Sequence, residues 1–424
     1  MTSVIAPVII AIASFVLRLF HLGLPKGLIF DELYYVDGAR DLLNFGVEVT
    51  GVDPEFVVHP PLGKWLIAGG IAIFGDNEFG WRFATAVIGT FLILLVARLV
   101  HVLFYSPFLT ALAAGLMAID GLLLVHSRTA LLDLFLTFFT VLGIYMWIRN
   151  RHWWAGFAFG LALGCKWSAI YFIAVIALIT LYRIPVAHDI RETPRKIAGV
   201  VAKYGLLPLT VYTLTWLGWF FSDRGWDRQS SSNPFIALIN YHAEMLSFHV
   251  GLTEKHPYQA NPLGWLLMLR PTSFFYDSPK GCASDECSRE VLAIGTPFLW
   301  WIGTIAILFV VYRWIKSLRN RTTDNAANIV IVGLVAGYLP WFALPDRTMF
   351  TFYAIIIQPF LILAIVYCAK LLLESRLNPV VSQSIIAGGF TLILICFLYF
   401  LPLFTGQLIT YDQWQDRMWF DSWI

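Results

Sequence analysis

The sequence is poor in charge. Lys, Arg, Asp and Glu make up 13% of its 424 residues, about half of the roughly 25% that soluble domains carry. This shortage excludes a disordered chain, a coiled coil and a basic nucleic-acid-binding protein. Cysteine is scarce as well, and five residues in a chain of this length cannot form the framework of a disulfide-rich scaffold.

Apolar residues are abundant instead. They make up 58% of the chain, and the mean hydropathy is +0.72. A soluble globule has too little interior to bury so many apolar side chains, so most of them must face lipid. Aromatic residues reach 16%, with 17 Trp, which indicates additional contacts at the membrane interfaces.

Eleven apolar stretches approach the length of roughly 20 residues that a membrane-spanning helix needs. The sequence therefore predicts an all-α polytopic integral membrane protein whose residues 1–424 form a single domain. The first stretch lacks the basic residues that precede the apolar core of a cleavable signal, so we expect it to be retained. The predicted spans are residues 4–22, 81–105, 107–127, 129–148, 152–164, 167–183, 197–221, 293–315, 327–344, 347–373 and 384–404.

Lys and Arg residues indicate the orientation of these spans. With the N-terminus in the cytoplasm, the inner segments carry a net charge of +10 and the outer segments carry −6. Residues 23–80, residues 222–292 and the C-terminal tail 405–424 then lie outside, and we expect helices within the outer loops to lie in the interface. So much ordered surface on one face favours a site at the outer interface over a transport channel.

Two adjacent carboxylates, Asp31 and Glu32, follow the first span on the outer side. Asp is a good N-cap and Glu suits a first helical turn, so both residues could simply begin a helix. They could also supply a general base at the membrane surface, where a lipid-linked substrate presents its head group. The two interpretations are compatible.

A second motif, residues 59–64 (His-Pro-Pro-Leu-Gly-Lys), lies in the same outer segment. Pro61 is placed to open a helix over the apolar stretch 62–74, which is too short to span a membrane. His59 and Lys64 could extend polar groups to the interface, or they could face a phosphate.

Four cations lie at the outer edges of predicted spans, where charged residues are costly and often functional. They are Arg82, Arg128, Lys166 and Arg347. Each alone could be a helix-end side chain that reaches the interface, but together they suit a phosphate held beneath the outer surface. Asp133 lies one turn into the predicted span 129–148 and could pair with Arg128.

The outer segment 222–292 contains His242, His249 and His256 at intervals of seven residues. No acid completes a convincing set of ligands, so no metal site is predicted. We expect instead an aromatic interfacial loop near a sugar or peptide site, to which His256 and Tyr258 contribute.

Cys282 and Cys287 lie five positions apart in the same segment. On an oxidising face this spacing favours a small local disulfide, with free thiols as the alternative. The sequence contains no convincing Gly-rich nucleotide-binding loop, Ser-His-Asp order or zinc motif.

In their order and membrane positions, these motifs resemble those of the protein O-mannosyltransferases, polytopic glycosyltransferases of the GT-C class, and most closely their actinobacterial branch. The resemblance runs through nearly the whole chain. It is carried by residues 30–32 (Phe-Asp-Glu), 59–64, 80–82 (Gly-Trp-Arg), 127–133, 166–167 (Lys-Trp), 256–258 (His-Pro-Tyr) and 417–420 (Arg-Met-Trp-Phe).

The resemblance implies a GT-C fold and inverting transfer of mannose from polyprenyl phosphate mannose to Ser or Thr hydroxyls of exported proteins. It implies Asp31 as the catalytic carboxylate, Glu32 as its necessary neighbour, and Arg82, Lys166 and Arg128 at the donor phosphate. It implies no required cofactor, and a divalent cation at the two carboxylates is conceivable but not indicated.

The resemblance also implies a cell-membrane enzyme whose active site and C-terminus lie outside the cytoplasm. Its partners would be the lipid-linked donor, membrane lipids and unfolded secretory proteins, met near the Sec translocon. One rival is a related GT-C transferase with a lipid or glycan acceptor, of the aminoarabinose or arabinose type. Another is a lipid-linked sugar transporter, against which the clustering of charges on the outer side argues.

Overall fold

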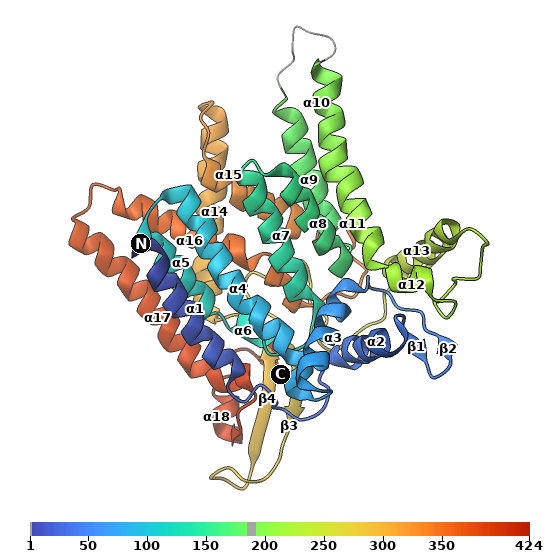
Figure 1. Ribbon diagram of the computed structural model, residues 1–424. Helices are drawn as coiled ribbons and strands as arrows, with labels where there is room; N and C mark the ends of the chain where they lie inside the picture. Colours follow the sequence, from blue (N-terminus) through green and yellow to red (C-terminus); the bar gives the residue numbers. More distant parts are fainter. Residues whose placement is uncertain (1, 185–191) are drawn as a thin grey trace. The chain divides into compact units, whose positions relative to one another are not determined.

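The computed structural model describes residues 2–184 and 192–424, and helices dominate it (Figure 1). Every stretch predicted to span a membrane contains helical structure, so the all-α expectation is confirmed. The chain forms two compact units, each assembled from separate stretches of sequence. Unit 1 contains residues 1–30, 86–129 and 255–424, and unit 2 contains residues 31–85 and 130–254.

Unit 1 is built mainly of helices from both ends of the chain. Most of α4 belongs to it, from Ala86 onward. Short 3-10 helices precede α16 and occupy several loops. The α-helices are α1 (Thr2–Leu19), α4 (Glu78–Phe104), α5 (Pro107–Ala118), α6 (Gly121–His126), α14 (Pro297–Arg319), α15 (Asn325–Gly337), α16 (Gln358–Leu373), α17 (Pro379–Thr405) and α18 (Tyr411–Gln415).

A small antiparallel sheet lies in unit 1, in the order β3-β4-β5. Its strands are β3 (Thr272–Asp277), β4 (Cys287–Ala293) and β5 (Ile409–Thr410). The β3–β4 register shifts between Ser273 and Phe275. Strand β5 pairs with the first two residues of β4 and so ties the C-terminal segment to the segment before α14.

Unit 2 contains the segment that follows residue 30 and the middle third of the chain. A two-stranded sheet of β1 (Val49–Thr50) and β2 (Asp53–Pro54) lies between its first two helices. The helices are α2 (Glu32–Phe45), α3 (Leu62–Phe74), α7 (Leu132–Ile148), α8 (His152–Cys165), α9 (Ala169–Tyr182), α10 (Glu192–Val201), η1 (Ala202–Leu206), α11 (Leu207–Thr215), α12 (Leu217–Phe221) and α13 (Pro234–Gly251).

Helix α3 begins where the sequence predicted. Pro61 stands at its N-cap, and the helix runs over the apolar stretch 62–74. Proline suits this position because its missing N–H has no helical partner there. Gly63 allows close packing, since a Cβ at this position would lie 2.6 Å from a methyl carbon of Leu132 on α7.

Asp120 interrupts the predicted span 107–127 and divides it into α5 and α6. Its side chain accepts a hydrogen bond from Leu123 N at 2.9 Å, which caps α6. The carboxylate is fully buried and also accepts from Trp300 Nε1 at 2.8 Å and Gln358 Nε2 at 3.1 Å. These bonds satisfy a polar group whose burial would otherwise be costly.

The lengths of the helices differ in detail from the predicted spans. Among the residues that the structure describes, five helical segments are long and apolar enough to cross a membrane, and several predicted spans are shorter apolar helices. The span predicted over 347–373 begins late, because a loop and the 3-10 helix η4 (Thr351–Ile356) precede α16. The count of eleven crossings stays a prediction.

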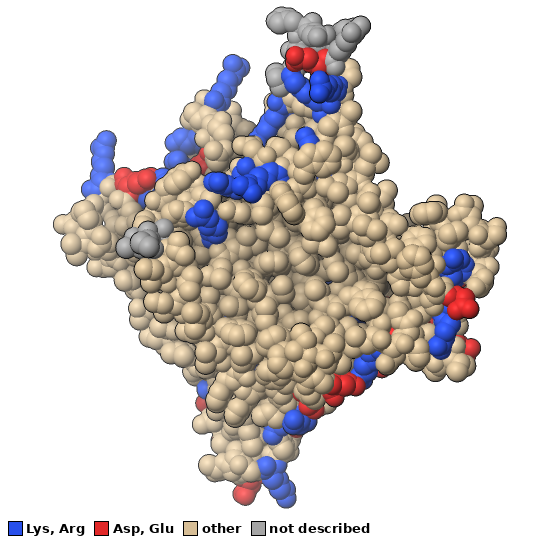
Figure 2. All heavy atoms as spheres, viewed as in Figure 1, with Lys and Arg blue, Asp and Glu red and all other residues tan. Residues whose placement is uncertain are grey.

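Charged side chains are distributed as in a membrane protein. On the face drawn in Figure 2, Lys, Arg, Asp and Glu gather in groups, and much of the remaining surface carries none of them. Helix α17 contains no such residue over 379–405, and large apolar side chains are exposed along it, among them Ile385, Leu392, Ile395 and Leu398. Such flanks suit lipid contact.

Candidate active site

Asp31 directly precedes α2 in unit 2, but its side chain does not cap that helix. It accepts a hydrogen bond from the Tyr35 hydroxyl at 3.3 Å, one turn further along. Asp31 is partly exposed. The simple helix-start interpretation of this residue therefore does not account for its side chain.

The surroundings of Asp31 make its carboxyl group less acidic. Burial raises the pKa of Asp31 to about 6, while the charge of Lys166 lowers this pKa, Asp133 raises it and the Tyr35 hydrogen bond lowers it. Lys166 and Asp133 thus lie near enough to act on Asp31. A carboxylate with this pKa is mostly ionised at neutral pH and yet basic enough to accept a proton.

Glu32 is committed to a buried ion pair. Its two oxygens accept from Arg82 Nε and Nη2, both at 2.8 Å, and neither side chain is exposed. The backbone N–H of Ala130 also donates to Glu32, at 2.9 Å. The pair fastens α2 to the first turns of α4 and to the segment that leads into α7.

Lys166 forms the second buried ion pair of the site. Its Nζ donates to both oxygens of Asp133, at 2.8 and 3.0 Å. Lys166 stands at the C-terminal end of α8, where its backbone is extended, and Asp133 lies in the first turn of α7. The sequence suggested Arg128 as the partner of Asp133, whereas the structure pairs Asp133 with Lys166.

His59 and Lys64 also lie in unit 2. The His59 ring lies 5.9 Å from the Tyr35 ring and 5.4 Å from the His249 ring, measured between centroids. Lys64 is buried, and its Nζ lies 2.5 Å from Glu48 Oε1. His59 thus connects with the surroundings of Asp31 through Tyr35, while Lys64 fastens the segment that follows α2 to α3.

The remaining predicted residues belong to unit 1. Arg128 donates to carbonyl oxygens at the C-terminal end of α1, including those of Arg18 at 2.8 Å and Phe20 at 2.7 Å. A cation there is favourable, because unpaired carbonyls carry partial negative charge. Arg347 lies over the Trp341 ring, 5.7 Å from its centroid, in a loop before η4.

His256 and Tyr258 form a local aromatic cluster in unit 1. The Tyr258 N–H donates to His256 Nδ1 at 3.1 Å, and the His256 ring meets Phe350 edge to face at 5.0 Å. Cys282 and Cys287 are joined by a disulfide, with their Cα atoms 5.9 Å apart. Within residues 2–184 and 192–424, no group of three or more potential metal ligands lies together.

Sequence reasoning missed several residues that the structure brings to unit 2. Tyr35 had a usable signal, because residues four positions apart share one face of a helix. Glu48 had none, since its pairing with Lys64 depends on how the segment between α2 and α3 folds back. His249 was noticed only for its spacing, and the structure shows it bonded through Nε2 to the Val58 carbonyl at 2.8 Å.

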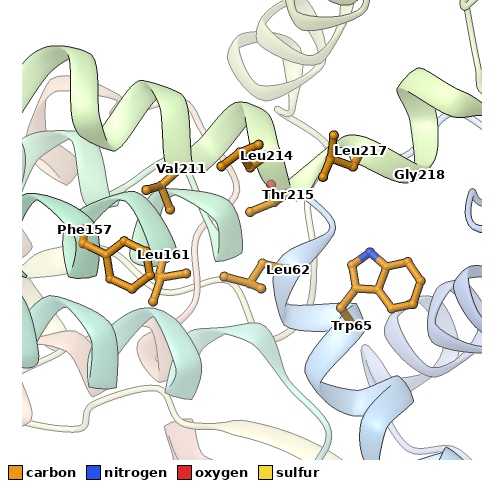
Figure 3. A pocket seen from close by; sticks show the side chains of 9 residues that line it. All are labelled: Leu62, Trp65, Phe157, Leu161, Val211, Leu214, Thr215, Leu217 and Gly218. Carbon is orange, nitrogen blue, oxygen red and sulfur yellow. The ribbon is translucent and has the colours of Figure 1, made fainter.

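An apolar groove of about 410 Å³ lies on unit 2, between α3, α8, α11 and α12 (Figure 3). Gly164 on α8 packs closely against two of the residues that line the groove. A Cβ at this glycine would lie 2.8 Å from Thr215 Cγ2 and 3.3 Å from Leu62 Cβ. Gly164 also stands two residues before Lys166 in the sequence. Its lining residues are Leu62, Trp65, Phe157, Leu161, Val211, Leu214, Thr215, Leu217 and Gly218.

Known structures share this fold. The S. cerevisiae protein O-mannosyltransferase Pmt1–Pmt2 complex bound to the sugar donor matches with a TM-score of 0.83 at 14% identity, over 100% of this chain and 93% of that one. ArnT from Cupriavidus metallidurans bound to undecaprenyl phosphate matches with a TM-score of 0.56 at 15% identity, over 93% of this chain and 64% of that one. The protein has the GT-C fold.

Sequence comparison identifies the family. A family model described as dolichyl-phosphate-mannose-protein mannosyltransferase matches residues 8–221, and one for the C-terminal four-span region of protein O-mannosyltransferase matches residues 234–423. Polyprenol-phosphate-mannose–protein mannosyltransferases of Mycobacterium tuberculosis and Mycolicibacterium smegmatis are each 32% identical, over 93% and 98% of this chain and 86% and 92% of their own lengths. The chain belongs to the protein O-mannosyltransferase family.

Proposed function

We propose that this membrane protein transfers mannose from polyprenyl phosphate mannose to Ser or Thr hydroxyls of proteins, with Asp31 as the general base. One observation carries the assignment of the base: Asp31 directly precedes α2, but its side chain does not cap this helix. Its partial exposure and the nearby charges of Lys166 and Asp133 agree with this role. The names of the 32%-identical relatives support the donor and the protein acceptor.

The reaction needs one base and a stabilised leaving group. Asp31 accepts the proton of the acceptor hydroxyl while the hydroxyl oxygen bonds to the anomeric carbon of mannose. The bond from that carbon to the phosphate oxygen breaks, and its electron pair leaves with the polyprenyl phosphate. A single displacement inverts the anomeric carbon, so a β-linked donor gives an α-linked product.

Lys166 is the cation best placed to hold the departing phosphate. Its Nζ donates to both carboxylate oxygens of Asp133. Asp133 orients the cation, and the positive charge of Lys166 attracts the phosphate. A fixed positive charge at the leaving oxygen stabilises the transition state without a general acid.

For Arg82 and Arg128, direct contact with the phosphate stays a prediction. The Glu32–Arg82 pair supports a role in holding α2 beside α4, and so in placing Asp31. The carbonyl contacts of Arg128 support a role at the end of α1. The pairing of the Lys64 Nζ with Glu48 supports a role of Lys64 in fold stability.

The groove in Figure 3 suits the first part of the donor's polyprenyl chain. Its lining is almost wholly apolar, and Gly164, which packs against Leu62 and Thr215 of that lining, stands two residues before Lys166. An isoprenoid chain seated there would carry its phosphate to the ion pair. Burial of such a chain contributes affinity in proportion to the apolar area removed from water.

The membrane orientation follows from the charge distribution of the sequence. The N-terminus lies in the cytoplasm, and the site and the C-terminus lie outside, in the cell membrane. The acceptor must present an extended, unfolded segment to reach a site at the membrane surface, which places the enzyme near the Sec translocon.

The experiment is incubation of purified protein with polyprenyl phosphate mannose and a Thr- and Pro-rich peptide, with and without a chelator. We expect mannose on the peptide in both cases. A parallel reaction with lipid acceptors tests the rival transferase function. Transfer to lipid alone, or no transfer under any condition, would overturn the proposal.

A further inference from the structure

The residue that follows Lys166 is held by a chain of side-chain hydrogen bonds. Trp167 Nε1 donates to the Tyr212 hydroxyl at 3.0 Å, and that hydroxyl lies 2.5 Å from His242 Nε2. His242 Nδ1 lies 2.7 Å from the Leu238 carbonyl oxygen. The chain links the α8–α9 connection, helix α11 and helix α13 within unit 2.

The donor and the acceptor of each of these hydrogen bonds can be assigned. A carbonyl oxygen only accepts, so Nδ1 of His242 carries the proton and donates to Leu238. Nε2 of the neutral ring is then an acceptor, and the Tyr212 hydroxyl donates to it. That hydroxyl in turn accepts from Trp167. Burial lowers the pKa of His242, which favours this neutral ring.

Ring contacts reinforce the bonds. The His242 ring stacks on the Trp167 ring at 5.6 Å with an interplanar angle of 26°. Tyr212 is buried and lies in the aromatic core around Trp216 and Tyr241. The Trp167 side chain is thereby fixed in both position and rotation.

Fixing Trp167 has a direct consequence for Lys166. The connection from α8 to α9 is only residues 166–168, and the Lys166 backbone is extended. With so few residues between two helices, the orientation of Trp167 restricts that of its neighbour. Lys166 must in turn point back to Asp133 on α7.

We propose that His242, acting through Tyr212 and Trp167, is a positioning residue for Lys166 and hence for the grip on the donor phosphate. The inference rests on the proposed function of Lys166. Helix α13, which carries His242, would then help to align Lys166, a residue of another part of unit 2.

The test is a double-mutant cycle read out as the affinity of the purified protein for polyprenyl phosphate mannose. Tyr212→Phe removes one oxygen and breaks the chain at its centre. We expect it to weaken donor binding about tenfold, equivalent to roughly 1.4 kcal/mol. In a Lys166→Met background the same change should alter donor affinity less than about twofold, because the cation to be aligned is absent.

Tyr204→Phe is the matched control. Tyr204 is also buried, its hydroxyl lies 2.7 Å from His152 Nδ1, and it stands eight residues before Tyr212 in the same helical run. We expect donor affinity to stay within about twofold of the wild type, because removing a hydroxyl remote from Lys166 leaves the positioning chain intact. His242→Gln keeps an acceptor for Tyr212 and should retain more affinity than His242→Leu.

Equal losses for Tyr212→Phe with and without Lys166, or no loss at all, would overturn the inference. Donor affinity that does not depend on Lys166 would overturn it as well. Peptide mannosylation by the wild type is measured separately, so the proposed function can stand when this inference fails. Absence of that transfer would instead count against the proposed function.

Discussion

Glu32 and Arg82 form a bidentate ion pair in which neither side chain is exposed, with both nitrogen–oxygen distances at 2.8 Å. Glu32 is the direct neighbour of Asp31, so the pair fixes the start of α2 and with it the proposed base. The two adjacent carboxylates therefore have different tasks: one is locked in the protein interior, and the other remains partly exposed.

Removing Glu32 should destabilise the protein strongly. Glu32→Ala leaves the buried charge of Arg82 without its partner, and breaking such a pair costs about 3–5 kcal/mol. Thermal unfolding in detergent measures the loss. Glu374→Ala is the control, because the Glu374–Lys370 pair is largely exposed and should matter little. Equal unfolding temperatures for both variants would contradict this interpretation of the pair.

Mannose transfer should fall in acid as Asp31 becomes protonated. Burial raises the pKa of Asp31 to about 6 from an ordinary value of 3.8, so the base is lost as the pH falls through about 6. Below that pH, kcat/KM for the acceptor should fall roughly tenfold per unit. A pH–rate profile of the wild type that stays flat down to pH 4 would exclude this carboxylate as the base.

Tyr35→Phe should shift that profile. The Tyr35 hydrogen bond lowers the pKa of Asp31, so its removal should move the acid limb to higher pH. Tyr34→Phe is the matched control, because Tyr34 is the preceding residue and is 72% exposed. The same measurement on both variants separates loss of the bond from a general effect on α2. Identical profiles would show that the bond does not tune the base.

Lys166 and Lys64 are both buried lysines paired with a carboxylate, and they should behave differently. Lys166→Met should raise the KM for the donor at least tenfold, because the phosphate loses its cation. Lys64→Met should lower the unfolding temperature but leave the donor KM within about threefold, because Lys64 then acts only in fold stability. Steady-state kinetics with varied donor concentration measures the donor KM of both variants. If Lys64→Met raised the donor KM more than Lys166→Met, the phosphate would have to be assigned to Lys64 instead.

Filling the groove should weaken donor binding. Leu214→Trp places a large ring in it, whereas Leu209→Trp alters an exposed position of the same helix that does not line it. The first change should raise the donor KM about tenfold, because the ring occupies space that the isoprenoid chain needs, and the second should leave this KM nearly unchanged. Equal KM values in a series of donors with different chain lengths would place the lipid elsewhere.

The helices were largely predictable, because long apolar runs and a proline at a helix start leave few alternatives. Helix α3 begins after Pro61 as expected, whereas the break at Asp120 depends on partners in distant segments, such as Trp300. Within the site, residue types and positions pointed to Asp31 and Lys166. The pairings were beyond sequence reasoning, since Glu32–Arg82 and Asp133–Lys166 join residues 50 and 33 positions apart.

The hydrogen bonds that join Trp167, Tyr212 and His242 could not be predicted from the sequence either. The spacing of the three histidines in 222–292 was visible in the sequence, but spacing alone favoured no role. Only the packing of α13 reveals that His242 accepts from Tyr212 while His249 meets the Val58 carbonyl. Side-chain networks between separate elements therefore carry the part of the site that periodicity cannot predict.

In the proposed reaction, Asp31 removes the proton from the acceptor hydroxyl. The most direct test is the rate of mannose transfer to a peptide by purified Asp31→Asn protein, compared with the wild type and with Asp37→Asn, an exposed carboxylate on the same helix. A thermal unfolding curve confirms that each protein is folded. We predict a loss of about 100-fold or more for Asp31→Asn and near-normal transfer for Asp37→Asn. Near-normal transfer by folded Asp31→Asn protein would show that Asp31 is not the base.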